Sequence, residues 1–340
     1  MKKSKYLTLY FTFFSFLFLF FSFNKVEAAQ ECEGFTNNYG IEISKEECNR
    51  LQGLGFSVEY IQDMTEEEYE LNKDIYAEDM SIEKKYIKTT YYYSNGNTPG
   101  DKVANNSEST VKVIKSEELS ETEFYNQLLN EKVKEMQPLG TETGHKETSY
   151  KLFTVKIAKL SNGKYRAYTE LDWKKIPKTR EEDIMGATFR YPNYFIVNHT
   201  ERFGRQSWGA KGCHLDYGGC VDSKEMYGNI YYDDDSGKWL NDSFAGNAIA
   251  MNLKNDFYRD NHYYRITKLN LYSYFNFAFN RSGYPYYNVQ IKGAYNHQIN
   301  SSPINLSGVS ITWGPPVLDF SFNQDKNYDG EITAQAYIKK

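Results

Sequence analysis

YRAYTELDW at residues 165–173 and KLNLYSYFNFAF at residues 268–279 are the stretches that decide the fold class. In the first, Tyr165, Ala167 and Thr169 alternate with more polar residues, and Leu171 and Trp173 continue the alternation. Successive side chains of a strand point to opposite faces, so this period of two predicts strands with one face in a core and one face toward solvent.

Similar alternation recurs along the second half of the chain. The further runs lie at 152–160, 185–191, 194–203, 226–232, 245–253, 289–295, 318–322 and 332–338. Many short strands joined by Gly, Asn and Asp turns are typical of an antiparallel β-sandwich, and a closed barrel is the alternative. Upstream, Ser44 and Thr65 each begin a capping-box pattern, which predicts two or three short helices.

The predicted fold class is therefore α+β, with a small N-terminal helical module followed by an antiparallel β-sandwich. The predicted organisation is a signal peptide at 1–28, the helical module at 29–80, an α/β connecting region at 81–147 and the β-sandwich domain at 148–340.

The N-terminus has the order of a secretory signal. Lys2, Lys3 and Lys5 precede an apolar run from residue 6 to residue 23, and Ala28 follows as a small residue at a cleavage position. A retained anchor is the alternative, because about 18 apolar residues just span a bilayer. We expect a secreted protein with no transmembrane segment after signal removal.

Charge excludes one class of partner. The chain has 340 residues, with 40 Lys+Arg and 45 Asp+Glu. Residues 1–28 hold four Lys and one Glu, so the remainder has 36 basic and 44 acidic residues, a net charge of −8. We therefore expect no nucleic-acid partner, because binding to phosphate backbones needs an excess of Lys and Arg.

Four cysteines in an exported chain predict disulfides. Three pairings are open, and the local pairs Cys32–Cys48 and Cys213–Cys220 are favoured because each closes a short loop. A Cys/His metal site that includes His214 is the competing interpretation, but no CxxC spacing supports it.

Two segments carry a resemblance. The run CNRLQGLGFSVEYIQDMTEEEY at 48–69 and the run YRAYTELDWKKIPKTREEDIMGATF at 165–189 resemble an uncharacterised group of exported proteins of Gram-positive bacteria. In that group a Cys/Leu-Gly-Phe-Ser helical motif precedes a β-rich half. The resemblance implies export and this architecture, and it implies no activity and no catalytic residues.

Calcium is the only cofactor that the sequence suggests. Asp325, Asn327 and Asp329 occupy the first, third and fifth positions of an EF-hand-like loop, with Gly330 at the sixth. The twelfth position holds Ala336 instead of the bidentate Glu, and the flanking residues predict strands rather than helices. A hairpin turn explains the same residues, so the main prediction is that the protein has no cofactor.

A hydrolase is the alternative function. His214 and Asp216 lie two residues apart and face the same side of an extended segment. With a third ligand or a nucleophile they would form a catalytic centre, and carboxylates on distant strands would serve glycoside hydrolysis. No GxSxG, HExxH or glycine-rich phosphate loop occurs in the chain.

The functional signal in the composition is its 31 Tyr residues. Where two Tyr are adjacent in a strand, one of them faces outward and can stack on a sugar or anchor a protein interface. We therefore expect a non-catalytic binding or envelope-associated protein that recognises a glycan or protein surface, in an oligomeric state that the sequence leaves open. The candidate binding residues are Tyr231, Tyr232, Tyr263, Tyr286, Tyr287, His214, Asp216 and Tyr217.

Overall fold

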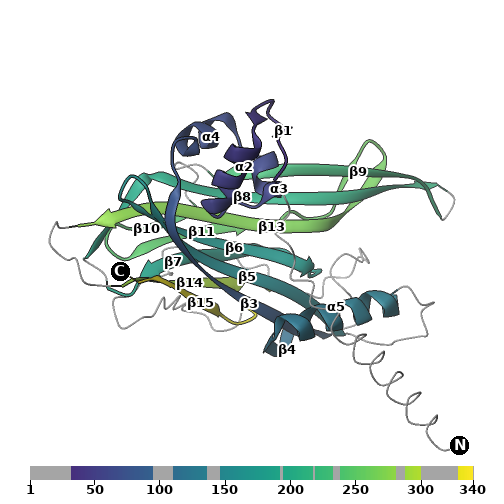
Figure 1. The fold of residues 1–340 in the computed structure, drawn as a ribbon. Helices are drawn as coiled ribbons and strands as arrows, with labels where there is room; N and C mark the ends of the chain where they lie inside the picture. Colours follow the sequence, from purple (N-terminus) through teal and green to yellow (C-terminus); the bar gives the residue numbers. More distant parts are fainter. Residues whose placement is uncertain are drawn as a thin grey trace, which may run out of the picture. The chain divides into compact units, whose positions relative to one another are not determined.

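The computed structural model describes residues 32–94, 110–135, 146–191, 194–216, 219–232, 238–280, 288–299 and 328–339. Its contacts divide the chain into two compact units. The first comprises Met1–Gln52 and Phe56–Lys73, and the second comprises Gly53–Gly55 and Asp74–Lys340. Figure 1 shows the elements of both units. Antiparallel β-sheet dominates the described residues, so the prediction of a β-rich chain is confirmed.

The first unit is small and mixed. It contains the strands β1 (Phe35–Thr36) and β2 (Glu42–Ile43) and the short helices α2 (Lys45–Gly53), α3 (Val58–Gln62) and α4 (Glu66–Asn72). The purely helical module expected over 29–80 is not seen, because β1 pairs with β2 and residues from Ala77 onward already belong to a long strand.

Side chains fix the helix starts of this unit, as the sequence predicts. Thr65 accepts a hydrogen bond from the backbone of Glu68, and the Glu68 side chain accepts one from the backbone of Thr65. Ser44 and Glu47 make the same reciprocal pair. Ser57 caps α3 by accepting from the backbone N–H of Tyr60.

Two sheets form the second unit. An eight-stranded antiparallel sheet has the order β4-β3-β5-β6-β13-β8-β9, with β12 paired to β13. Its strands are β3 (Ala77–Ser94), β4 (Thr110–Leu119), β5 (Lys146–Leu160), β6 (Tyr165–Lys175), β8 (Phe195–Asp216), β9 (Gly219–Tyr232), β12 (Phe257–Arg259) and β13 (His262–Phe279). β3 and β4 lie in this sheet, so the boundary expected at 148 does not mark where the sheet begins.

A five-stranded antiparallel sheet has the order β10-β11-β7-β14-β15. Its strands are β7 (Glu182–Phe189), β10 (Trp239–Asp242), β11 (Gly246–Asn252), β14 (Val289–His297) and β15 (Ile332–Ile338). The expected strand at 318–322 lies outside the described residues. The described strands form two open sheets, so the closed barrel, the alternative to the sandwich, is wrong for this part of the chain.

The two sheets share one apolar core. Val155 and Leu171 of the larger sheet and Met185 and Ile291 of the smaller one are all fully buried in it. The sheets approach closely at Gly293, where an added Cβ would lie 2.3 Å from the Val155 side chain. Core packing between alternating faces is what the period of two predicts.

The alternation predicts the wrong exposure for two residues. Arg166 and Tyr274 lie on the faces expected to meet solvent, yet both are buried. The Arg166 guanidinium stacks on the Tyr274 ring at 4.5 Å and donates to Asn276 at 2.6 Å, which compensates the buried charge. A polar residue with internal partners is therefore as compatible with burial as an apolar one.

One longer helix, α5 (Glu121–Glu135), packs beside β3, and Ser120 and Glu123 form a capping box at its start. Phe124 and Leu128 of this helix are buried, whereas Val133 is 48% exposed. Among the described residues, no helix is long and apolar enough to cross a membrane.

Glu131 connects α5 to the sheet. Its carboxylate accepts hydrogen bonds from Tyr150 at 2.8 Å, from Lys175 at 2.9 Å and from Thr148. Burial alone would raise the pKa of Glu131, but the bonds from Thr148, Lys175 and Tyr150 lower that pKa to about 2. The folded pKa lies below the ordinary value of 4.5, so the carboxylate stabilises the fold above that pH.

We expect Glu131→Gln to reduce the free energy of unfolding by about 1–2 kcal/mol at pH 7, after allowing for solvent screening. The loss should shrink as the pH falls from 4.5 toward 2, where the wild-type carboxylate also becomes neutral. Urea unfolding over this pH range measures the effect. Glu121→Gln on the same helix is the control and should cost about 0.5 kcal/mol or less. If the difference in free energy of unfolding between wild type and Glu131→Gln did not change with pH, the prediction would be contradicted.

Candidate functional site

The predicted tyrosines divide between surface and core. Tyr231 is 41% exposed on β9, whereas Tyr232 is buried, and its hydroxyl accepts from Gln206 at 3.2 Å. Tyr263 is half-buried on β13. Tyr217, Tyr286 and Tyr287 lie outside the described residues, as do the side chains of His214 and Asp216.

Two further tyrosines are the most exposed aromatic residues described. Tyr227 on β9 is 68% exposed and Tyr258 on β12 is 69% exposed. Tyr258 pairs with Tyr263 across the β12–β13 hairpin, with ring centroids 4.9 Å apart. Tyr227 lies opposite Gly209 of β8, and its ring covers the space that a Cβ there would occupy. We call Tyr227, Tyr258 and Tyr263 the aromatic face.

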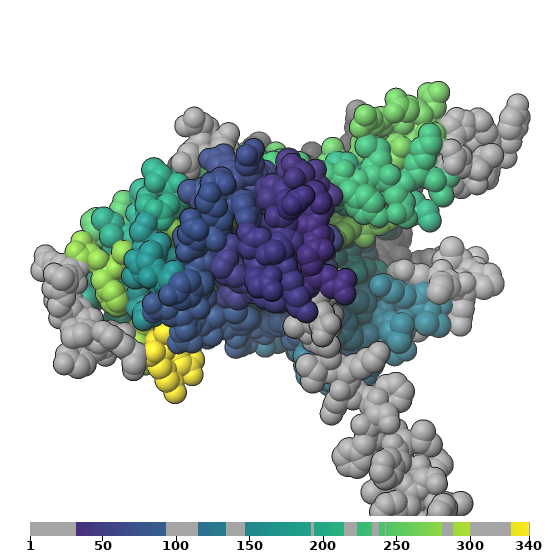
Figure 2. Space-filling model, turned by 45° about the horizontal axis from the view of Figure 1, so that its top comes forward, coloured from purple at the N-terminus to yellow at the C-terminus, as the bar shows by residue number. Residues whose placement is uncertain are grey.

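The strands that carry the aromatic face run side by side. β13 pairs with both β12 and β8, and β8 pairs with β9. In Figure 1 these strands extend toward one end of the larger sheet, and in Figure 2 their green segments lie together at the surface. The three rings of the aromatic face therefore lie on hydrogen-bonded neighbouring strands of the larger sheet.

A second layer of rings supports the aromatic face from the core side. Phe257 stacks on Tyr264 at 5.0 Å, with the ring planes 9° apart, and Trp208 meets Phe257 edge-on at 5.6 Å. Gly212 makes room for Tyr264, because an added Cβ would lie 2.4 Å from that ring.

Sequence reasoning missed Tyr227 and Tyr258, although a signal for Tyr258 was present. FYRDNHYY at 257–264 reads as two short strands around a two-residue turn, which places Tyr258 opposite Tyr263. Asp260 and Asn261 have φ values of 49° and 61°, the left-handed geometry of a type I′ turn.

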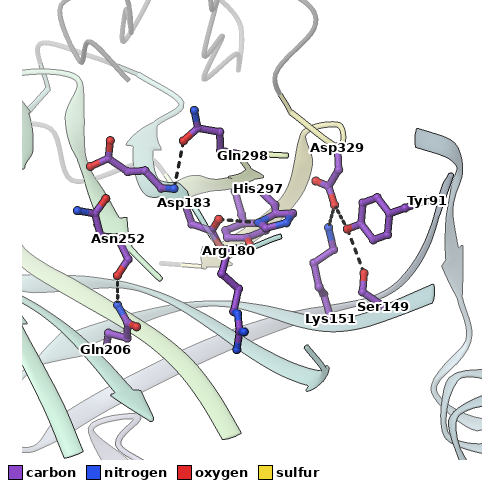
Figure 3. Close-up of polar contacts among 12 residues, drawn as sticks. Tyr91, Ser149, Lys151, Arg180, Asp183, Gln206, Asn252, His297, Gln298 and Asp329 are labelled. Carbon is purple, nitrogen blue, oxygen red and sulfur yellow. Dashed lines mark hydrogen bonds and ion pairs between the residues drawn. The ribbon is translucent and has the colours of Figure 1, made fainter. Parts of the chain in front are cut away.

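A group of buried ionisable side chains lies elsewhere, between the two sheets (Figure 3). Lys151 of β5 and Asp329, which precedes β15, form an ion pair with both side chains fully buried. Tyr91 of β3 donates to the same carboxylate oxygen at 2.7 Å, and Ser149 donates to the Tyr91 hydroxyl at 3.1 Å. The Lys151 ammonium also lies 5.1 Å from the Trp173 ring centroid.

A second buried pair adjoins the first. His297 Nδ1 of β14 lies 2.7 Å from the carboxylate of Asp183 on β7, and the Tyr295 hydroxyl donates to the same carboxylate. Burial, followed by the charges of Asp183 and Asp329, raises the pKa of Tyr295 well above its ordinary value. We call these residues, with the Lys151–Asp329 pair, Tyr91, Ser149 and Trp173, the buried polar cluster.

The buried polar cluster favours cohesion over catalysis. Lys151, Asp329, His297 and Asp183 have no exposed side-chain surface, so a substrate cannot reach them without separating the sheets. Each pair instead joins strands: Lys151–Asp329 spans the two sheets, and His297–Asp183 joins neighbours within one. Arg180 and Asp256 form a further ion pair at 2.8 Å, and Figure 3 draws Arg180 beside the cluster.

The calcium prediction is only partly covered. Asp325 and Asn327 lie outside the described residues. Asp329 is described, and one of its carboxylate oxygens is engaged by Lys151 and Tyr91. Within the described ranges no three acidic, His or Cys side chains are grouped as metal ligands. Calcium binding by this loop stays an untested alternative to the prediction of no cofactor.

The cysteines are oxidised where the structure describes them. Cys32 and Cys48 form a disulfide with their Cα atoms 5.7 Å apart, as the local pairing predicts. Cys213 is also disulfide-bonded. The side chain of Cys220 lies outside the described residues, so the Cys213–Cys220 pairing stays a prediction.

Comparison with known proteins adds no functional assignment. No protein-family model matches the chain, and no curated protein matches it. Among solved structures, the chain is 10% identical to AvmM, which catalyses macrocyclization in alchivemycin A biosynthesis, with a TM-score of 0.21 over 52% of this chain and 79% of that chain. It is 9% identical to Clostridium perfringens delta-toxin, with a TM-score of 0.16 over 58% of this chain and 86% of that chain. Similarity at this level supports no conclusion about fold or function.

We expect Lys151→Met to reduce the free energy of unfolding by about 3–5 kcal/mol, because it leaves the buried Asp329 carboxylate without its cation. Asp329→Asn added to this variant should recover more than half of the loss. Urea unfolding of the single and double variants measures the coupling. Lys115→Met, which removes an exposed ion pair with Glu117, should cost about 1 kcal/mol or less. A similarly small loss for Lys151→Met would refute the role of the pair.

We expect Asn261→Gly to raise the free energy of unfolding by about 0.5 kcal/mol, because glycine adopts the left-handed turn geometry without a Cβ penalty. Asn162→Gly is the matched control. Asn162 does not have a positive φ, and its side chain accepts a hydrogen bond from the Lys164 backbone N–H at 3.1 Å. This control should destabilise the protein. Thermal unfolding distinguishes the two, and equal shifts would contradict the turn assignment.

Proposed function

We propose that this chain is a secreted, non-catalytic binding protein of β-sandwich architecture that holds a glycan or protein surface at or near the cell envelope. The observation that carries the proposal is the aromatic face. Tyr227 and Tyr258 expose more than two thirds of their surface, whereas most aromatic residues of the neighbouring strands are buried in the core. Large exposed rings beside a well-packed core suit recognition better than folding.

The aromatic face has the properties of a preorganised binding surface. Tyr258 is held against Tyr263, and the Tyr263 hydroxyl donates to Asp256 at 3.1 Å. The Tyr227 hydroxyl donates to Glu225 at 2.7 Å. Rings already fixed in position lose little conformational entropy on binding, and their faces are apolar while their edges remain polar.

Secretion is supported by cysteine chemistry. The Cys32–Cys48 bond and the oxidised Cys213 fit an oxidising compartment. Residues 1–28 lie outside the described residues, so the signal peptide remains a prediction from the apolar run and its flanking lysines.

The hydrolase alternative needs accessible acids. The buried carboxylates Asp183 and Asp329 are engaged by His297 and Lys151, which favours the binding function. The His214–Asp216 centre lies outside the described side chains. Turnover of any glycoside or ester in a substrate panel by the purified protein would favour the hydrolase.

We expect Tyr227→Ala and Tyr258→Ala each to weaken binding about five- to tenfold, because each removes one stacking ring worth about 1–1.5 kcal/mol. Glycan and protein arrays probed with the wild-type chain identify a ligand, and titration then gives the affinities.

Tyr337→Ala is the control for this experiment. Tyr337 is 48% exposed, but it lies on β15 of the smaller sheet. Its replacement should leave the affinity within twofold. Equal losses in all three variants would refute binding by the aromatic face.

A further inference from the structure

Three cations lie beside the aromatic face. Arg265 of β13 and Lys211 of β8 are directly opposite each other, and Lys268 is opposite Gly209 in the same pair of strands. All three are exposed, whereas their neighbours Ile266, Ala210 and Leu269 are buried in the core. The cations therefore lie on the outer side of the sheet.

This arrangement is costly for the folded protein alone. Like charges directly opposite on paired strands destabilise a sheet. Among the described residues none of the three forms a close ion pair, although the charge of Lys268 interacts with that of Asp172 on β6. A local conflict of this kind, only partly compensated inside the fold, is expected at functional sites.

Acidic neighbours neutralise the group only in part. Glu225 is opposite Lys211, but its carboxylate accepts the hydrogen bond from Tyr227. Asp260 pairs with Arg259 at 3.5 Å, and Asp256 pairs with Arg180 at 2.8 Å. Asp172 of β6 interacts electrostatically with Lys268, but its carboxylate also pairs with Lys174. The acids near the three cations are therefore shared with other partners, in a chain whose net charge is −5.

Cations and rings share one surface. Gly209 lies between them, because a Cβ there would meet the Tyr227 ring at 3.0 Å and the Lys268 Cβ at 3.2 Å. Tyr263 and Arg265 are two residues apart on one strand and so lie on the same side of it. A ligand stacked on the rings is therefore within reach of the ammonium and guanidinium groups.

We propose that this surface binds an anionic polysaccharide, with sugar rings stacked on Tyr227 and Tyr258 and acidic substituents paired with Lys211, Arg265 and Lys268. The proposal rests on the proposed binding function and names its ligand class. Charge complementarity selects an acidic partner, and the flat, exposed tyrosine rings select sugars.

A lipid bilayer fits this surface less well. Insertion into an interface needs exposed Leu, Phe or Trp, and here Phe257, Ile266 and Leu269 point toward the core. The exposed groups are phenols and charges, which suit a hydrated polymer.

The test uses the mature chain and polygalacturonate, with its neutral methyl ester as the matched probe. We expect tighter binding to polygalacturonate, with an affinity that falls as salt rises. Lys211→Gln/Arg265→Gln/Lys268→Gln should weaken this binding by about tenfold or more. Lys84→Gln/Lys132→Gln/Lys178→Gln changes the net charge equally at exposed lysines elsewhere and should stay within twofold of wild type.

The outcomes separate this inference from the proposed function. Equal loss in both triple variants, or equal binding of the acid and the ester, would overturn the anionic ligand while leaving glycan binding intact. Stronger binding to phosphatidylglycerol vesicles than to polygalacturonate would assign the surface to membranes and overturn the inference. Failure of the wild-type chain to bind any arrayed glycan or protein would instead refute the proposed function. Thermal unfolding of each variant excludes loss of folding as the cause of weaker binding. The single change Lys211→Glu is a second variant for the case in which the triple variant does not fold.

Discussion

The Lys151–Asp329 ion pair is the interaction on which the arrangement of the two sheets depends. Two charges removed from water cost several kcal/mol unless each finds its partner in good geometry. Here the partners come from β5 of the larger sheet and from the segment before β15 of the smaller one. The two side chains meet only when the sheets are correctly placed against each other. The ion pair therefore favours this relative position of the two sheets.

The neighbouring contacts follow from that placement. The Asp329 backbone N–H donates to the His297 carbonyl at 3.0 Å, which ties the start of β15 to the end of β14. His297 in turn meets Asp183 on β7. Charge, aromatic packing and strand pairing therefore reinforce one another across this end of the core.

The strands were predictable because their alternation is local. β6, β13, β14 and β15 all appear where the period of two predicts them. The buried polar cluster was not predictable, since Lys151 and Asp329 are 178 residues apart and neither has a local pattern that reveals the other. Arg166 was placed on the solvent side because period alone ignores compensation by stacking. The aromatic face was predictable in part: Tyr263 was identified, and its partner Tyr258 required the two-residue turn to be recognised.

The position of β9 at the end of the larger sheet has a consequence for solubility. Among the described strands β9 pairs with β8 alone, and β4 pairs with β3 alone, so both leave one row of backbone groups open. An open edge recruits strands from other chains unless charged residues oppose it. Lys224 and Glu225 on β9, and Lys115 and Glu117 on β4, supply such charges. These charges oppose edge-to-edge pairing between chains, and sequence changes on these two strands would remove that protection before the core was affected.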